Sequence, residues 1–575
     1  MAGFGDAVAA ISLTIELFNL CVDGLCAISR AKHSHESLLD FNTRLDLEIA
    51  RLVLWGRNAG LDRNELDASL EPVQPLLTRI LSAVSSSIQD ADHLKASYGL
   101  SLVEEPPAGD SPKTQSPSST FSERLDILSI PQISSGIQRQ QMISLQLKKR
   151  TGLYKKAKWA LWDEGKAICF VEAIKGYIDG LNKLLTESEK ATLDAETNVM
   201  RIAILGTNWS QPAKMLSTIE SATLGRYDSL ALPARLARFR LELEMEEAAP
   251  SLSYSSQPFA APLPIPYDRL QPLDADRSLA IFQNRNVLVE WRNLTASEAT
   301  GETGKARKRQ AGKLAAVIHQ LQAHPTEYRI LDCIGYIDQL DHMPPRLGIV
   351  FNISKNTLPS IPARKPLYSL YEYISSKDFE DFQPSLGARF ELARNLAQGF
   401  LQFHQSGWFH KNIRSHNIIF LPEGENKSVE SPFILGFGYS RPLETGISDP
   451  VRGDDELTLY RHPKYTEASG NGFKLQYDLF SIGLLLFEIA KWRPLKYYFT
   501  RLQRHDRTMT PSSFIAALVE KEKDELEFRV GTHYATAALT CINGTFEVEG
   551  DDPNNTRLKL AYFEKVVKNL RPCKA

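Results

Sequence analysis

The sequence predicts two domains, an all-α helical bundle followed by an α+β unit. Through residues 1–245, apolar residues recur at intervals of three and four, which is the period of a helix. Six prolines then fall between Ala248 and Pro272 and interrupt any regular element. Short β-type runs follow, and long helical stretches come after them. We therefore expect a bundle at 1–245, a Pro/Ser-rich linker at 246–274 and a second domain at 275–575.

The composition is that of a globular protein. The chain has 575 residues, 43% of them hydrophobic and 24% charged, which excludes a disordered chain and a collagen. Its 67 Lys and Arg against 69 Asp and Glu give a formal charge of -2, so we expect no nucleic-acid partner. The six cysteines are scattered without a CxxC pair, which predicts neither a disulfide framework nor a zinc site. We expect a cytoplasmic protein.

The first element is a long apolar helix, Ala7 to Ile28. It lacks the positive charge and cleavage site of a secretory signal, and it is about as long as a bilayer-spanning helix. Glu16 lies within it, and a carboxylate there is costly in lipid. Two interpretations stay open: a core helix of the bundle, or a helix that enters a membrane on activation.

Further helices complete the predicted bundle. Leu38, Phe41, Leu45, Ile49 and Leu52 form one stripe of a helix at 35–55. The stretch 104–120 is rich in Pro, Ser and charge and is expected to be a disordered loop. No strand is expected before residue 245. Helical patterning recurs at Leu76, Ile80 and Val84, at 138–185 and at 195–205.

One segment of the bundle is strongly basic. From Gln138 to Lys183, ten Lys or Arg face four Asp or Glu, giving +6. Such a segment attracts anionic lipid by about 1 kcal/mol per cation near the surface, although a solvated helix face has the same composition. The candidate membrane contacts are Glu16, Leu17, Phe18, Lys148, Lys149, Arg150, Lys155, Lys156 and Lys158.

The second domain begins with strands and continues with helices. Asn286–Trp291, Tyr328–Ile337 and Leu347–Ile353 are short β-type runs, with an amphipathic helix at Lys305–Gln322 between the first two. Large helices dominate from Leu386 onward. This order predicts an α+β fold of two lobes.

Four segments of this domain resemble a protein kinase. HKNIRSHN follows the catalytic-loop pattern H-R-D-L-K-x-x-N in register, with His410, Lys411, Asn412, Arg414 and Asn417 in its slots. Three further segments follow in kinase order. Gly436-Phe437-Gly438 takes the place of Asp-Phe-Gly, YRHPKY at 460–465 resembles the Ala-Pro-Glu segment, and Asp478 matches an aspartate that in kinases anchors the catalytic loop. The resemblance covers roughly residues 275–570 and implies a bilobal kinase-like fold.

Most of the kinase chemistry is absent from these slots. Asn412 replaces the catalytic aspartate and cannot accept a proton as a carboxylate can, and Gly436 replaces the metal-holding aspartate. The lysine slot falls at Glu290, or at Arg292 on the same face, and Glu290 would repel a triphosphate. No glycine-rich loop precedes this strand, and the helix at 305–322 offers no acidic partner. The sequence therefore predicts a pseudokinase that is not an enzyme, with no cofactor, since ATP and Mg²⁺ lack most of their usual ligands.

The first domain resembles the HeLo domain of fungal prion-inhibition and propagation proteins, the heterokaryon-incompatibility type. The resemblance covers roughly residues 3–220. It implies a soluble bundle that exposes its N-terminal helix when triggered and permeabilises a membrane to kill the cell. The motifs that carry it are GFGDAVAAISLTIELFNLCVDGL at the N-terminus, RLDLEIARLVLWG at 44–56 and KKAKWALWD at 155–163.

Together the two resemblances predict a non-catalytic fungal cell-death effector in which a pseudokinase controls a membrane-targeting bundle. Two alternatives remain: a divergent protein kinase that binds ATP, and a scaffold that lyses nothing. The expected partners are a protein, or a second copy through the bundle, and an anionic membrane on activation. The expected location is the cytoplasm, with the plasma membrane after activation.

Overall fold

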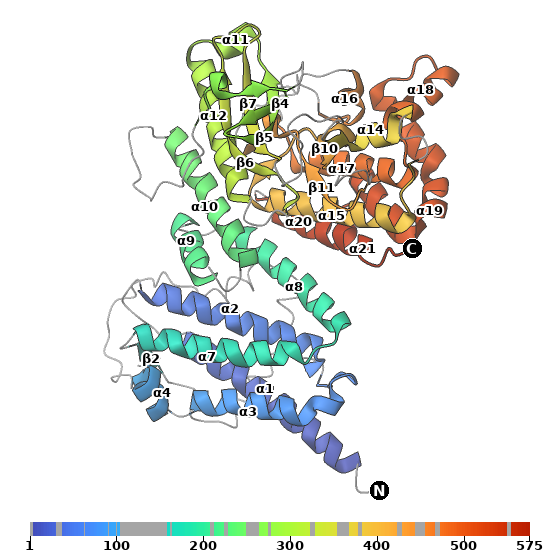
Figure 1. The fold of residues 1–575 in the computed structure, drawn as a ribbon. Coiled ribbons are helices and arrows are strands. Elements are labelled where there is room, and N and C mark those ends of the chain that lie inside the picture. Colours follow the sequence, from blue (N-terminus) through green and yellow to red (C-terminus); the bar gives the residue numbers. More distant parts are fainter. Residues whose placement is uncertain are drawn as a thin grey trace, which may run out of the picture. The chain divides into compact units, whose positions relative to one another are not determined.

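The chain divides into two compact units, Met1–Arg235 and Leu236–Ala575, called here the N-terminal and C-terminal units. The division falls within helix α10 (Asp228–Ala248). The computed structural model, drawn in Figure 1, describes residues 4–29, 37–61, 64–89, 91–98, 100–103, 158–161, 164–206, 212–223, 228–248, 264–273, 278–321, 328–353, 367–377, 382–421, 428–442, 455–465, 472–548, 552 and 554–575.

The N-terminal unit is built mainly from helices, as predicted. Helices α1 and α2 cover the first two predicted helices. Helix α7 covers only the last part of the stretch predicted at 138–185, and α8 contains the helix predicted at 195–205. Helix α1 packs against both α2 and α3, and α2 packs against α7, α8 and α9. The helices are α1 (Phe4–Ser29), α2 (Ser37–Asn58), α3 (Gln74–Gln89), α4 (Ala91–Tyr98), α7 (Glu164–Lys183), α8 (Glu187–Gly206) and α9 (Pro212–Thr223).

The prediction of an N-terminal domain without strands was wrong. Strand β1 (Leu100–Val103) pairs antiparallel with β2 (Lys158–Leu161), with Leu100 opposite Leu161. A four-residue strand is too short for its alternation to emerge from the sequence, and its partner is remote along the chain. The expected disordered loop at 104–120 and residues 138–157 of the basic segment lie outside the described residues.

The core of the N-terminal unit is centred on Trp55 of α2. Its indole Nε1–H donates to the Leu181 carbonyl oxygen at 3.2 Å, and its ring lies 6.3 Å from the fully buried Phe18 ring of α1. The Phe18 ring also lies directly over Gly56, because a Cβ at that position would be 2.1 Å from it. Glycine is therefore required at position 56 for α1 to approach α2 this closely.

Helix α3 buries a face shifted by one residue from the predicted stripe. Leu77, Leu81, Val84 and Ile88 are buried, whereas Leu76 is 44% exposed. Of the predicted stripe Leu76, Ile80 and Val84, only Val84 is among these buried residues. Apolar residues flank the stripe on both sides, so the pattern alone did not decide which of them faces the core.

The C-terminal unit begins with a five-stranded antiparallel sheet in the order β3-β4-β5-β7-β6. Helix α12 (Gly301–Leu321) packs on β6 and β7 and buries its predicted stripe of Leu314, Val317, Ile318 and Leu321. The predicted strands and helix are all present. The strands are β3 (Gln271–Pro272), β4 (Leu279–Phe282), β5 (Arg285–Asn293), β6 (Asp332–Gln339) and β7 (Arg346–Asn352), and α11 (Ala296–Ala299) precedes α12.

Part of the predicted linker belongs to this sheet. Residues 264–273 were expected between the domains, but β3 pairs with β4 and the Ile265 N–H donates to the Tyr336 carbonyl oxygen at 2.8 Å. Proline is tolerated here because β3 is a two-residue strand at the edge of the sheet. Residues 249–263 of the predicted linker lie outside the described residues.

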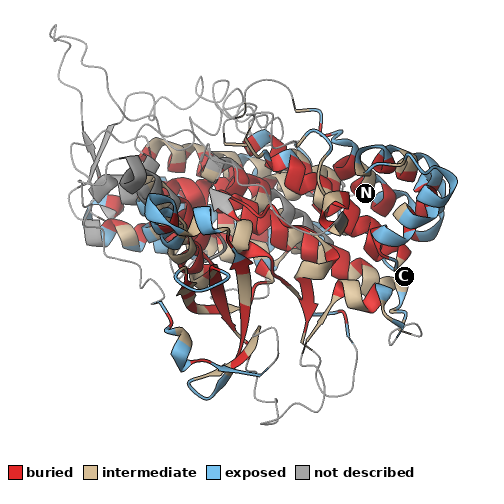
Figure 2. Ribbon diagram, turned by 90° about the horizontal axis from the view of Figure 1, so that it is seen from above, coloured by how far each residue is buried: buried red, intermediate tan, exposed pale blue. Residues whose placement is uncertain are grey.

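The rest of the C-terminal unit is mostly helical, so the unit combines helices with antiparallel sheets. Helix α17 is buried along nearly its whole length and packs against α19. Figure 2 colours the buried residues red. The helices are α14 (Leu370–Ser375), α15 (Leu386–Gln405), α16 (Asp455–Leu459), α17 (Leu475–Lys491), α18 (Leu495–His505), α19 (Pro511–Asn543), α20 (Thr556–Tyr562) and α21 (Lys568–Leu570), and the short strands are β8 (Tyr368–Ser369), β9 (Trp408–Phe409), β10 (Ile418–Phe420), β11 (Pro432–Ile434) and β12 (Arg441–Pro442).

The contact between Phe18 and Gly56 gives a stability prediction. Gly56→Ala should lower the free energy of unfolding of the N-terminal unit by about 1–3 kcal/mol, the usual cost of overpacking, because the Phe18 ring must move. The measurement is chemical denaturation of the full chain followed by circular dichroism. The matched control is Gly176→Ala on α7, where nothing lies within 4 Å of the added Cβ. Because alanine favours a helix more than glycine does, Gly176→Ala should raise the free energy of unfolding by about 0.5–1 kcal/mol. Equal stability of the two variants would refute the packing argument.

Candidate functional site

The loop between β9 and β10 is held by a buried carboxylate. Asp478, near the start of α17, is 1% exposed. Its Oδ2 accepts the His410 N–H at 2.7 Å, and its Oδ1 accepts the Lys411 N–H at 2.8 Å. His404 Nε2 lies 3.1 Å from Oδ2. These contacts tie the loop backbone to α17, which is the role implied for Asp478 by the sequence motif.

His410 is a core residue of this region. It is fully buried, and its ring packs 5.0 Å from the Phe437 ring and 5.7 Å from the Phe400 ring. Burial lowers the pKa of His410 to about 4, although the nearby Asp478 opposes that shift. The imidazole is therefore neutral at physiological pH.

Asn412, Asn417 and Gly436 meet at the end of the loop. The Asn417 Nδ2–H donates to the Asn412 carbonyl oxygen at 2.7 Å. Gly436 has φ of 95°, and a Cβ there would lie 2.4 Å from Asn417 Nδ2. Backbone and packing thus both disfavour any side chain at position 436. Arg414 precedes this corner with extended backbone and is half-buried.

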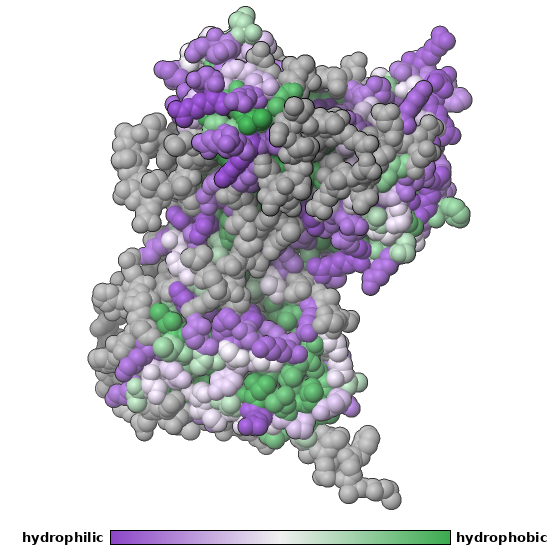
Figure 3. Space-filling model, viewed as in Figure 1, coloured by the Kyte–Doolittle hydropathy of each residue, from purple (hydrophilic) through white to green (hydrophobic). Residues whose placement is uncertain are grey.

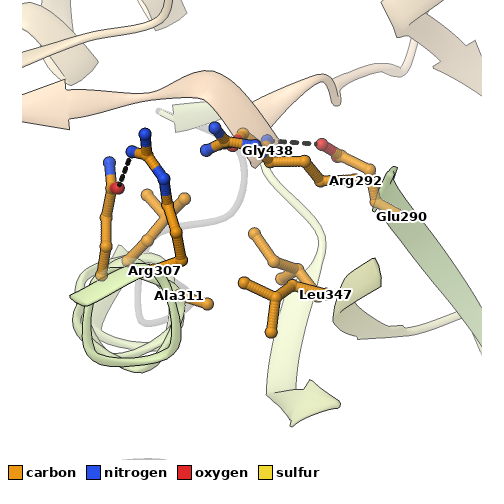
Figure 4. A pocket seen from close by; sticks show the side chains of 9 residues that line it. Glu290, Arg292, Arg307, Ala311, Leu347 and Gly438 are labelled. Carbon is orange, nitrogen blue, oxygen red and sulfur yellow. Dashed lines mark hydrogen bonds between the residues drawn. The ribbon is translucent and has the colours of Figure 1, made fainter. Parts of the chain in front are cut away.

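Glu290 binds the turn that follows Gly436. Its Oε2 accepts the Gly436 N–H at 2.9 Å and its Oε1 accepts the Gly438 N–H at 2.7 Å, as Figure 4 shows for Gly438. Burial raises the pKa of Glu290, and the backbone N–H groups oppose that shift. This use of the carboxylate was not foreseen from the sequence, where only repulsion of a phosphate was expected.

Arg292 completes the contact between β5 and the same turn. Its Nη1–H donates to the Gly438 carbonyl oxygen at 3.0 Å, and its guanidinium lies 5.0 Å from the Tyr439 ring centroid. Glu290 and Arg292 therefore bind the donors and an acceptor of one backbone turn, η6 (Phe437–Tyr439). We call this arrangement the β5 clamp.

A small open pocket lies beside the β5 clamp. Its empty volume is about 320 Å³, including space open to solvent. From α12 it receives Arg307 and Gln310, and Arg307 Nη1–H donates to Gln310 Oε1 at 3.3 Å (Figure 4). The lining residues are Glu290, Arg292, Arg307, Gln310, Ala311, Leu314, Leu347, Ile349 and Gly438.

A second buried carboxyl group, Glu488, escaped the sequence analysis. It is fully buried in α17, where its Oε1 accepts the Tyr460 hydroxyl at 2.7 Å and the Leu495 N–H at 2.8 Å. The Tyr460 hydroxyl also lies 3.0 Å from the Ser415 hydroxyl. This network joins the loop of η5 (Ser415–Asn417) to α17 and the start of α18. No sequence signal marks it, because Glu488 lies in an otherwise apolar helix.

The predicted membrane contacts belong to the other unit and divide into three groups. Glu16 is exposed and Leu17 half-buried on α1, and Phe18 lies in the core of the bundle, so its contact with a membrane stays a prediction for a state in which α1 is released. Lys158 begins β2. The others, Lys148, Lys149, Arg150, Lys155 and Lys156, lie outside the described residues.

Helix α1 is apolar enough for a membrane and is also hydrogen-bonded to its neighbour in the bundle. Its stretch Ala10–Ser29 is long and apolar enough to cross a membrane, a property that core helices share. The Gln74 amide on the neighbouring α3 donates to the Ala10 carbonyl oxygen at 2.9 Å and to the Thr14 hydroxyl at 2.8 Å. Leu13 is 48% exposed, and Figure 3 shows hydrophobic side chains gathered on the surface of this unit.

Glu488 makes stability depend on pH. Burial raises its pKa from 4.5 to about 7, so between these values the unfolded chain ionises at this residue while the folded chain does not. The contribution of Glu488 to the free energy of unfolding should therefore fall by about 3 kcal/mol as pH rises through this window, at about 1.4 kcal/mol per pKa unit. Denaturation of wild type and Glu488→Gln from pH 4.5 to 7.5 measures it. The exposed Glu430→Gln is the control, and parallel pH profiles for all three proteins would contradict the expectation.

Comparison with known families divides the chain in the same order. Residues 5–208 match the model of the HeLo family, described as prion-inhibition and propagation. Residues 291–572 match a family described as a domain of unknown function, DUF7580. The first match covers helices α1 to α8 almost completely, and the second contains Asp478, Arg292 and the η6 turn and begins one residue after Glu290. The chain thus carries an N-terminal HeLo domain followed by a domain of unknown function.

Proposed function

We propose that the protein is a non-catalytic cell-death effector of the fungal incompatibility type, in which a pseudokinase restrains a membrane-targeting HeLo bundle. The HeLo domain suggests incompatibility signalling. The observation that carries the proposal is helix α1, which is apolar enough to cross a membrane and is held in the bundle partly by polar contacts. On this proposal the protein is cytoplasmic and moves to the plasma membrane when α1 is released.

Polar contacts supply only a small part of the restraint of α1. Hydrogen bonds such as those from Gln74 contribute about 0.5–1.5 kcal/mol each, so the larger part comes from buried residues such as Phe18 and Leu25. Release therefore requires a change that competes with this packing. A trigger acting through the C-terminal unit, with self-association or a protein partner, would supply it.

The pseudokinase part of the proposal rests on the C-terminal unit. A five-stranded antiparallel sheet carrying one helix, followed by a mainly helical region, suits the two lobes of a kinase. Asp478 holds the loop backbone as the kinase motif implies. Both oxygens of Glu290 bind backbone N–H groups, and the Asn412 amide cannot accept a proton, so neither residue supplies the catalytic base of a kinase.

Membrane action can be tested with an exposed leucine on α1. Leu13→Glu should leave the bundle folded, because Leu13 is 48% exposed, but should reduce dye leakage from anionic vesicles at least about tenfold, since a charged residue in a membrane helix costs a few kcal/mol. Leakage is measured for the full chain and for fragment 1–245, whose folding is checked by circular dichroism.

The matched control is Leu76→Glu on α3, where the leucine is 44% exposed. Leu76→Glu should cause as much dye leakage from the vesicles as wild type does. Leakage by the fragment with a silent full chain is the result expected for a restrained effector. If neither protein causes leakage, the scaffold alternative replaces the effector. If both leucine variants leak equally, α1 is not the inserting helix.

Nucleotide binding tests the pseudokinase separately. Because Glu290 brings a carboxylate to the lysine slot, Mg²⁺ and ATP should leave the melting temperature of the full chain unchanged. A ligand at one hundred times its Kd would stabilise by about 2.7 kcal/mol, which a thermal-shift measurement resolves. A saturable, Mg²⁺-dependent shift that Asn417→Ala abolishes would instead support the divergent-kinase alternative.

A further inference from the structure

Helices α18 and α19 present two exposed faces of opposite charge. They lie at the periphery of the C-terminal unit, and Figure 2 colours much of their surface as exposed. Their inner sides are already used by the core: α18 buries Leu495, Tyr498 and Leu502, and α19 buries residues that include Phe514 and Leu518. The outward residues therefore contribute little to the fold.

The basic face runs along α18. Tyr497, Arg501 and Arg504 follow one another at i, i+4 and i+7, which places them on one side of the helix. Tyr497 is 44% exposed, and the Arg493 guanidinium lies 5.0 Å from its ring centroid. Arg507 extends the face just beyond the helix. Asp506 lies between these arginines, and the Thr508 backbone N–H and hydroxyl both donate to its carboxylate.

Arg504 and Arg507 are the arginines of the basic face that are available to pair with carboxylates of another molecule. Both are exposed, and within the described part of the chain no ion pair involves either of them. Arg501 lies 3.7 Å from Glu522, a longer contact. Cations near a helix C-terminus favour the helix dipole, which accounts for Arg504 but not for Arg493 or Tyr497.

The acidic face runs along α19 with the same spacing. Glu520, Asp524 and Glu527 are exposed at i, i+4 and i+7. Lys521 and Lys523 flank this stripe on its two sides. Phe528 borders it and is 90% exposed, so nearly the whole ring faces water. A non-helical Gly531 then kinks the helix and ends the face.

The two faces have the same spacing and opposite charge, so they can bind each other. Seven residues of helix cover about 10 Å in each, at 1.5 Å per residue, so arginines and carboxylates can be opposed in register. Each face also includes an exposed aromatic ring. Covering a ring such as Phe528 would stabilise the contact more than a single exposed ion pair does.

We propose that the basic face of one copy of this chain binds the acidic face of a second copy. The two faces are different surfaces, so the contact is heterologous and leaves one unused face at each end of a pair. Assembly therefore continues beyond the dimer. This self-association belongs to the C-terminal unit and does not depend on the membrane function proposed above.

The test uses two charge-reversal variants of the full chain in analytical ultracentrifugation at low and high salt. The basic-face variant is Arg504→Glu/Arg507→Glu, and the acidic-face variant is Asp524→Lys/Glu527→Lys. Wild type should form species larger than a dimer that dissociate as salt rises, because exposed charges are screened. Each variant alone should stay monomeric, because its altered face repels the intact face of the next copy. An equimolar mixture should assemble beyond the dimer again, because the two intact faces pair and the two altered faces, one now acidic and the other now basic, also attract each other.

Two controls keep this test decisive. Arg285→Glu/Lys574→Glu makes the same change of charge as the basic-face variant, at exposed positions outside both faces, and should assemble like wild type. Phe528→Ser should weaken assembly at least about tenfold if the ring is buried in the contact. Circular dichroism confirms that each variant is folded.

Three results would overturn the proposal. Wild type that stays monomeric at about 100 µM in low salt, a concentration that would populate a contact of about 5 kcal/mol, has no such contact. Variants that assemble like wild type would place self-association elsewhere. A monomeric wild type that binds phosphatidylserine vesicles through Arg504 and Arg507 would assign the basic face to lipid instead.

Discussion

The buried carboxylate of Asp478 is the constraint around which the C-terminal unit is arranged. A charge removed from water costs several kcal/mol unless hydrogen bonds replace its hydration. Here the amides of His410 and Lys411 supply those bonds, which fixes the loop after β9 against α17. Lys411 accepts a φ of 68° as part of this arrangement. With the loop fixed, Asn412 and Asn417 are placed beside the Gly436 turn.

The β5 clamp shows how a charged position can keep a structural role when its chemistry changes. On the proposed kinase descent, a cation would stand at position 290 and an anion at 436. The chain instead has a carboxylate at 290 and backbone N–H groups at 436 and 438. Hydrogen bonds thus hold the strand to the turn, with the Glu290 carboxylate as the acceptor and the backbone as the donor. Arg292 adds the reverse contact to the Gly438 carbonyl.

Much of the architecture was accessible from the sequence because its elements are long or strongly patterned. Helix α1, strands β5 to β7 and helix α12 all carry a clear period, and Asp478 was identified through motif order. The pair β1–β2 and the edge strand β3 were not predicted, since two to four residues carry no period. The Glu290 contact and the Glu488 network were also missed. Both depend on which residues meet in space, and a lone carboxylate in the sequence does not indicate its partners.

The corner at Gly436 makes an aspartate at this position costly. A side chain at this position meets two penalties at once, a left-handed backbone with φ of 95° and the Asn417 amide 2.4 Å from its Cβ. Relief of the second requires Asn417 to move, which breaks its bond to the Asn412 carbonyl. An aspartate at position 436 therefore needs coordinated substitutions among its neighbours. In evolutionary terms this is sign epistasis: the sign of the effect of Gly436→Asp on stability depends on which residues surround it.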